Sequence, residues 1–283
     1  MASLEPPSDS IPILPDLKPA DGPAQDHRRR FATSRVIMAL MLREMTSRYG
    51  RSPGGYIWAI LEPIGMLVVL SFGFSLMMRS PSLGDTFILF YASAYMVFTQ
   101  YRTVEKSVSK ALPYARGLLR YPIVTWLDAV LARFILNTLT GVLNTILILG
   151  GTIILTGSNV VLDMAPMVIA MSVATVLALG TGVLNGLLTG VWPLWNTLWG
   201  IITRPLMIAS AVLYIIEDLP AAAANVLWYN PLVHLTGLMR SGVYANYHPQ
   251  YISLIYVIGI AMVSLTVGLV FMRRYAASIV TDD

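Results

Sequence analysis

The sequence predicts an all-α integral membrane protein: six transmembrane helices, an N-terminal amphipathic interface helix and two short re-entrant helices before the last span. Three observations carry this prediction. The chain of 283 residues is 56% hydrophobic and 12% charged, whereas soluble domains carry roughly 25% charged residues. Its mean hydropathy is +0.67. Six apolar stretches occur, and all but the short second one reach the roughly 20 residues that a crossing needs.

The predicted spans cover about 56–78, 86–101, 123–156, 165–191, 196–216 and 252–272. The third stretch is too long for one crossing, because at about 1.5 Å per residue it would reach roughly 50 Å against a hydrocarbon core of about 30 Å. Its first turns should therefore project into the cytosol, with Asp128 outside the membrane and Arg133 at the headgroups. These two residues are five positions apart and do not share a helix face, so no ion pair between them is expected.

Basic residues set the orientation. Most lysines and arginines lie between residues 28 and 51, between 102 and 122, and at 273–274, whereas only Arg79 and Arg240 fall in the loops on the other side. Cytoplasmic loops carry the excess of Lys and Arg, so both termini are predicted to be cytosolic. The proline-rich residues 1–30 are expected to form a disordered cytosolic tail, residues 31–275 the transmembrane domain, and residues 276–283 a short cytosolic C-terminus.

Residues 31–49 have amphipathic spacing, with Met38, Leu42 and Met45 on one stripe and arginines opposite. We expect this helix to lie in the membrane interface, with arginines facing anionic headgroups. A soluble helix on a globular core is the alternative, which the adjacent span disfavours. The residues assigned to the interface helix and its glycine hinge are Arg35, Arg43, Glu44, Arg48, Tyr49, Gly50, Gly54 and Gly55.

Two connecting segments are unusual. Residues 102–122 are basic and broken by Pro113 and Gly117, which fits either a partner-docking helix and turn or a solvated positive-inside loop. Residues 217–251 are too apolar for an ordinary loop and too interrupted by prolines to cross. Two short helices dipping into the outer leaflet, at 220–228 and 231–242, would fit. Irregular backbone at that depth must be buried or line a wet cavity, so this segment predicts a gate or pore mouth.

Signals for catalysis are weak. The chain has no cysteine and only three histidines, without metal-ligand spacing, and it has no P-loop lysine motif. Residues 50–54 match the pattern of a nucleophile elbow, but that motif requires a preceding strand, and here a hinge between helices is the better interpretation. We therefore predict no catalytic residue, no metal site and no cofactor on this chain. The net charge of +4 is explained by membrane topology rather than by nucleic acid.

Aromatic residues and one arginine suggest a substrate path. Tyr91 and Tyr95 lie one turn apart inside the second span, and Trp195 and Trp199 lie around the fifth. Aromatic faces could stack on sugar rings, while an interfacial belt or packing is the alternative. Arg204 either snorkels to the interface or attracts an anionic substrate on a central path.

Three segments carry a family resemblance. The runs RVIMALMLREMTSRYGRSPGGYIWAILEP, SKALPYARGLLRYP and YNPLVHLTGLMRSGVY resemble segments of the membrane subunits of type-2 ABC exporters, particularly those that export capsular polysaccharide in Gram-negative bacteria. The similarity covers about residues 31–275. It implies six spans, an interface helix, a coupling helix between spans two and three, and two re-entrant gate helices. It also implies an inner-membrane homodimer whose channel carries a lipid-linked, anionic polymer.

The resemblance further implies partners: two copies of a cytosolic ATPase, which bind ATP and Mg, and a periplasmic co-polymerase or outer-membrane export component. The residues expected at the ATPase contact are Ser107, Lys110, Pro113, Tyr114, Arg116, Leu119 and Arg120. Those expected at the outer gate are Asn225, Trp228, Asn230, Pro231, His234 and Arg240. Two alternatives stay open. The same architecture could export O-antigen, a teichoic-acid-like polymer or a small drug, or the chain could be an integral membrane enzyme acting on lipids.

Overall fold

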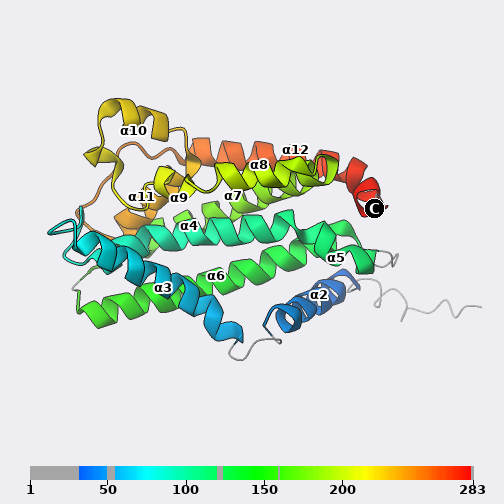
Figure 1. Ribbon diagram of the computed structural model, residues 1–283, viewed down its shortest axis with the longest axis horizontal. Helices are drawn as coiled ribbons and strands as arrows, with labels where there is room; N and C mark the ends of the chain where they lie inside the picture. Colours follow the sequence, from blue (N-terminus) through cyan, green and yellow to red (C-terminus); the bar gives the residue numbers. More distant parts are fainter. Residues whose placement is uncertain (1–31, 50–54, 120–123, 159, 282–283) are drawn as a thin grey trace, which may run out of the picture.

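Four long helices run side by side along the molecule. The computed structural model describes residues 32–49, 55–119, 124–158 and 160–281. Within these ranges the regular elements are all helices, without strands. In spatial order the long helices are α12 (Leu254–Thr281), α7 (Met164–Val191), α4 (Phe87–Ser109) and α6 (Trp126–Thr156) (Figure 1). The helix α2 (Ala32–Tyr49) packs on α6, and α3 (Gly55–Ser75) crosses α4 and α6 at an angle.

Four helices in the described ranges are long and apolar enough to cross a membrane: Ile57–Ser75 in α3, α6, α7 and Leu254–Ala276 in α12. The second predicted span is a helix but falls outside this set, because its later turns contain polar residues such as Gln100 and Arg102. It also continues to Ser109. The first part of the predicted loop 102–122 is therefore helical, and only α5 (Ala111–Leu119) is a separate short helix.

The predicted fifth span is not a single helix. Residues 196–216 divide into α8 (Leu194–Ile202), the one-turn α9 (Leu206–Ala209) and a non-helical stretch before η1 (Ile216–Asp218). Pro205 interrupts the first part, because proline cannot donate the backbone hydrogen bond that a continuous helix requires. The carbonyl groups of the non-helical stretch bind a side chain from another helix, as described below. Length and apolarity alone could not show this break.

The third predicted span begins slightly later than expected. α6 starts after Thr125, whose hydroxyl accepts a hydrogen bond from the Asp128 backbone N–H, while the Asp128 carboxylate accepts one from the Thr125 backbone N–H. Such a capping box satisfies donors that the first turn leaves free. Asp128 is thus a helix cap, and the expectation that it does not pair with Arg133 is confirmed.

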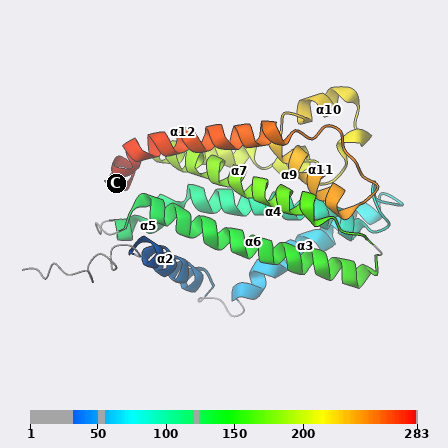
Figure 2. The same cartoon turned by 180° about the vertical axis from the view of Figure 1, so that it is seen from behind.

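Two short helices precede the last long one, as the proline pattern predicted: α10 (Ala221–Leu227) and α11 (Pro231–Val243). α11 packs against α7 and α4, whereas α10 projects from one end of the molecule. At the opposite end lie α5 and the C-terminal part of α12 (Figure 2). Whether α10 and α11 dip into a membrane stays a prediction.

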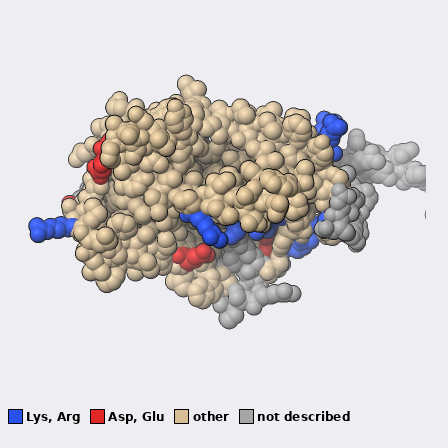
Figure 3. Space-filling view, turned by 45° about the horizontal axis from the view of Figure 1, so that its top comes forward, with Lys and Arg blue, Asp and Glu red and all other residues tan. Residues whose placement is uncertain are grey.

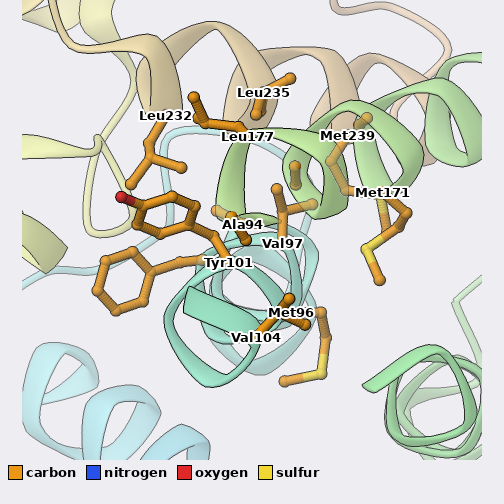
Figure 4. Packing of buried hydrophobic residues seen from close by; sticks show 14 of the residues in the cluster. Ala94, Met96, Val97, Tyr101, Val104, Met171, Leu177, Leu232, Leu235 and Met239 are labelled. Atoms are coloured by element: carbon orange, nitrogen blue, oxygen red, sulfur yellow. The ribbon is translucent and has the colours of Figure 1, made fainter. Parts of the chain in front are cut away.

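The core lies between α4, α7 and α11. Its buried side chains include Val97 and Val104 on α4, Leu177 on α7 and Leu235 on α11 (Figure 4). Glycines on α7 permit close approach. A Cβ at Gly182 would lie 2.8 Å from the Val108 side chain, and one at Gly186 would lie 3.0 Å from the Ser109 carbonyl oxygen. This confirms the tight packing that small residues four apart predicted.

Gly180 provides a test of this packing. A Cβ there would lie 2.5 Å from the backbone oxygen of Ala261 on α12, whereas a Cβ at Gly150 on α6 would meet nothing within 4 Å. We expect Gly180→Ala to destabilise the protein by about 1–3 kcal/mol through overpacking. Gly150→Ala should be neutral or slightly stabilising, because alanine is the better helix former. Thermal unfolding in detergent measures both, and equal melting temperatures would contradict the α7–α12 contact.

Candidate functional site

One arginine joins four helices near the α5 end of the molecule. Arg133 on α6 donates from Nε to both carboxylate oxygens of Glu44 on α2, at 3.0 and 2.9 Å. Its Nη1 atom donates to the backbone oxygens of Ser107, at 3.0 Å, and Lys110, at 2.9 Å, where α4 ends. Its guanidinium lies 4.3 Å from the ring centre of Tyr114 on α5. We call Arg133, Glu44 and Tyr114 the arginine junction.

The ion pair of the junction is shielded from solvent, since the side chains of Arg133 and Glu44 are 14% and 3% exposed. Two buried charges in contact stabilise each other, whereas one left alone is costly. Arginine suits this position because its planar guanidinium offers several donors in a fixed geometry. No partner of Arg133 could be predicted from the sequence, because Glu44 is 89 positions away and no local spacing connects the two residues.

The short helix α5 is held from several sides. Arg43 of α2 donates to the Tyr114 backbone oxygen at 3.1 Å, and the hydroxyl groups of Ser47 and Tyr114 share a hydrogen bond. Arg116 donates to the backbone oxygen of Ile279 on α12 at 3.2 Å. Side-chain contacts therefore connect α5 to α2, α6 and α12.

The predicted partner-contact residues divide by exposure. Lys110, Pro113 and Tyr114 are exposed, and Arg116 and Leu119 are half-buried. Ser107 is buried in the last turn of α4, so its side chain cannot reach a partner in this conformation. Arg120 lies outside the described residues.

The residues predicted for the interface helix and hinge belong to α2 and α3 or lie outside the described residues. Arg35 is exposed on α2, Arg48 and Tyr49 end α2, and Gly55 begins α3. Gly50 and Gly54 of the predicted hinge lie outside the described residues.

A second buried arginine organises the opposite end. Arg240 on α11 donates from Nη1 to the backbone oxygens of Ala211 and Tyr214, both at 2.7 Å. Its Nη2 atom donates to the backbone oxygen of Val212 at 2.8 Å. Its guanidinium lies 4.2 Å from the ring centre of Phe90 on α4. Arg240, predicted from the sequence to lie in the outer loops and assigned to the gate, is 1% exposed and therefore buried. It instead binds the carbonyl groups that the broken fifth span leaves without helical partners.

Other predicted gate residues surround this arginine. The side-chain oxygen of Asn230, Oδ1, caps α11 by accepting a hydrogen bond from the Leu232 backbone N–H. α11 begins at Pro231. The Asn230 amide donates to the Ala209 oxygen at 2.8 Å. His234 Nδ1 accepts from the Ser253 N–H, so its Nε2 must donate to the Trp228 oxygen at 2.8 Å.

The outer segment around α10 adds a polar surface. The Trp228 ring N–H donates to the Tyr251 backbone oxygen at 3.0 Å, and the Tyr247 hydroxyl donates to the Glu217 carboxylate at 3.0 Å. Burial raises the pKa of Tyr247, so this hydroxyl stays protonated at neutral pH. Asn225 is exposed on α10 and does not join these contacts.

The predicted path residues do not form one site. Tyr91 is 1% exposed and packs among the rings of Phe74, Phe87 and Phe90. Trp195 and Trp199 stack on each other at 6.1 Å. Arg204 is exposed between α8 and α9. Of the predicted path residues, only Tyr95 lines the two cavities described below, and it lines both.

The stacked tryptophans anchor α8 to the helices behind it. The Trp195 N–H donates to Asn185 on α7 at 2.9 Å, and the Trp199 N–H donates to Glu105 on α4 at 3.0 Å. Asn185 also donates to Glu105, at 2.8 Å. Glu105 and Asn185 were missed from sequence, because neither the basic segment around Glu105 nor the apolar run around Asn185 reveals the partners of these side chains.

Two cavities adjoin each other beside α4. A polar cavity of about 320 Å³ lies between α3, α4 and α6. A basic cavity of about 720 Å³ shares Glu62, Tyr95, Thr99 and Thr103 with it. The cations that line the basic cavity are Arg102, Lys106, Lys110 and Arg133. Figure 3 shows Lys and Arg side chains gathered in a recess on one face, with acidic side chains beside them.

These cavities could bind a ligand without a metal. In the described part of the chain no group of three or more His, Asp or Glu side chains comes close enough to hold a metal ion. Cationic side chains in a recess attract anions. Hydroxyl and amide groups can both donate and accept hydrogen bonds. The arrangement can therefore recognise a polar or anionic ligand, and no nucleophile–base pair is apparent among its described lining residues.

Comparison with known proteins gives consistent relatives. A family model described as ABC-2 type transporter matches residues 35–244. The chain is 28% identical to the polysialic acid transport protein KpsM of Escherichia coli, covering 90% of this chain and 99% of that protein. It is 26% identical to the capsule polysaccharide export inner-membrane protein CtrC of Neisseria meningitidis serogroup B and 24% identical to BexB of Haemophilus influenzae, which has the same description. Each of these two alignments covers 87% of this chain and 92% of the relative.

A double-mutant cycle tests the arginine junction. Arg133→Gln and Glu44→Gln should each lower the free energy of unfolding by about 3 kcal/mol, because each leaves a buried charge without its partner. The double variant should cost less than the sum of the two. Chemical denaturation in detergent gives the three values, with Arg79→Gln in an exposed loop as a control. Strictly additive losses would mean that the pair does not interact.

Proposed function

Because the chain belongs to the ABC-2 type transporter family, we propose that it is the membrane subunit of an ATP-driven exporter of capsular polysaccharide. Its relatives are described as capsule polysaccharide export inner-membrane proteins and as a polysialic acid transport protein. The similarity extends over nearly the full length of each relative. This supports the same location for our chain, in a bacterial inner membrane.

The observation that carries the proposal is the attachment of α5. Pro113 and Tyr114 of this helix and Lys110 just before it are exposed, while Arg133 and Arg116 connect it to the long helices. An exporter subunit without a nucleotide site needs such a contact to receive work from a separate ATPase. In our proposal two ATPase subunits, each binding ATP and Mg, dock at α5 of two copies of this chain. α2 supports each α5 from the membrane interface.

Orientation follows from the same contact. α5 and the C-terminal part of α12 lie at one end of the molecule, which would be the cytosolic end. The gate segment with α10 and α11 would then face the periplasm, where a co-polymerase or outer-membrane export component would receive the polymer. Six crossings per chain require that α4 and the broken segment α8–α9 also lie within the bilayer.

The basic cavity supports an anionic cargo. Its lining includes four cations, at the end where α4 meets α5, and two carboxylates, Glu44 and Glu62. Recesses with a net positive charge concentrate anionic ligands. The largely apolar exposed faces of α3 and α12, with residues such as Val69, Phe72 and Val263, suit contact with acyl chains or with the second copy. A lipid-linked acidic polysaccharide would satisfy both surfaces.

A bulky substitution on α5 tests the ATPase contact. A side chain at Gly117 would point into open space, as it would at Gly150 on α6. We expect Gly117→Trp to reduce copurification of the ATPase subunit at least tenfold and to abolish polymer export, while the matched variant Gly150→Trp retains both. Pull-down from membranes at equal permease level measures the first. Full ATPase binding by Gly117→Trp would contradict docking at α5.

Deletion identifies the cargo. In the source bacterium, deletion of this chain should leave the polysaccharide inside the cell and absent from the surface. Reintroduction of the chain should restore the surface polysaccharide. Surface immunolabelling and fractionated glycan analysis distinguish export from synthesis. An unchanged surface glycan, or loss of O-antigen alone, would show that the cargo is not capsule.

A further inference from the structure

We propose that the polar cavity between α3, α4 and α6 of a single chain binds a neutral, hydroxyl-rich sugar unit. The inference rests on the proposed function and makes it more specific, because it places a glycan subsite within one subunit. The polar cavity adjoins the basic cavity, with which it shares four lining residues, but the rest of its lining is different.

The first argument is the arrangement of polar residues. Thr99 and Thr103 on α4 are one turn apart, and Asn137, Thr140 and Asn144 repeat with helical spacing on α6. Both stripes face the same cavity, opposite α3. Polar residues within membrane helices are expensive and face a bundle interior or a water-filled space. Stripes on two helices that face one cavity therefore indicate a polar content for it.

The second argument is an unused acceptor. Gln100 is 1% exposed and its amide donates to Thr175 at 3.0 Å. Among the described residues, its Oε1 atom has no hydrogen-bond partner. On the facing helix a Cβ at Gly141 would lie 1.7 Å from this oxygen, so only glycine leaves room for it there. Buried polar atoms are nearly always satisfied, whereas this oxygen is an unsatisfied acceptor in the wall of the cavity.

The third argument is the chemistry of the walls. Trp58 on α3 is 59% exposed and lines the cavity together with Tyr95. Aromatic rings provide an apolar face with a polar edge, and the amides and hydroxyls beside them donate and accept. Sugar rings present C–H faces and a rim of hydroxyls, which these walls complement. The volume of about 320 Å³ lies in the range of small-ligand sites, roughly 300–1,000 Å³.

Charge separates the two cavities. Among the described residues, the polar cavity is lined by one carboxylate, Glu62, and by no lysine or arginine, whereas the cations gather in the basic cavity nearer α5. An acidic group or a phosphate would therefore occupy the basic cavity. The sugar next to it would reach the polar cavity through the opening beside Tyr95 and Thr99.

Cysteine chemistry tests the site without background, because the chain contains no cysteine. Thr99→Cys is introduced into the permease–ATPase complex in nanodiscs and exposed to a small hydrophilic methanethiosulfonate. The probe ligand is an oligosaccharide made by partial hydrolysis of the polymer that the source bacterium exports. We expect labelling of Thr99→Cys to slow at least tenfold with saturating oligosaccharide. The control Arg79→Cys, in an exposed loop, should label equally with and without it.

Affinity gives a second measurement. Thr99→Val removes one hydroxyl with little change in shape and should weaken oligosaccharide binding about tenfold in calorimetry, a loss of roughly 1.4 kcal/mol. Thr99→Ser should retain the affinity. If the unmodified complex binds the oligosaccharide but Thr99→Cys is unreactive or unprotected, the sugar site is overturned and the exporter proposal stands. Protection of both cysteines would also overturn the site. If the unmodified complex does not bind and deletion leaves the surface glycan intact, the proposed function itself fails.

Discussion

The contact between Arg133 and Glu44 constrains the whole α5 end of the molecule. A guanidinium that is largely buried must find acceptors for its donors, and Arg133 finds them on two other elements, α2 and the end of α4, while stacking on Tyr114 of α5. No single element can move away without leaving a charge or a carbonyl unpaired. The helices around α5 therefore behave as one mechanical unit, which is what a subunit needs if its work arrives from outside.

At the opposite end of the molecule a second buried arginine also binds backbone carbonyl groups, but there it stabilises an interruption between helices. Arg240 binds three carbonyl groups between Ala211 and Tyr214, where the backbone is not helical. Such groups cannot remain unsatisfied away from water. The broken segment after α9 depends on this side chain, because few other residues offer enough donors on a planar group. Arg133 thus joins separate helices, while Arg240 permits one helix to be interrupted.

Much of the helix pattern could be predicted from the sequence because it depends on local properties. Apolar length located α3, α6, α7 and α12, and prolines located α10 and α11. The failures concern contacts between distant residues. Arg240 counted as a loop charge, but it is buried against carbonyls up to 29 positions away. The fifth span looked continuous because apolarity says nothing of that contact. Tyr91 suggested a path by its depth, and only the surrounding rings show that it packs in the core.

The helix α4 connects the two functional regions. One of its faces packs in the core through Val97 and Val104, while another places Tyr95, Thr99 and Thr103 along the cavities at intervals of about one turn. The next residue in that series, Ser107, gives its carbonyl oxygen to Arg133. A helix held by backbone hydrogen bonds moves nearly as a rod over this distance. If α5 receives the ATPase as proposed, its displacement would act through Arg133 on the same helix face that lines the cavities, so that docking and ligand binding would be mechanically linked within a single chain.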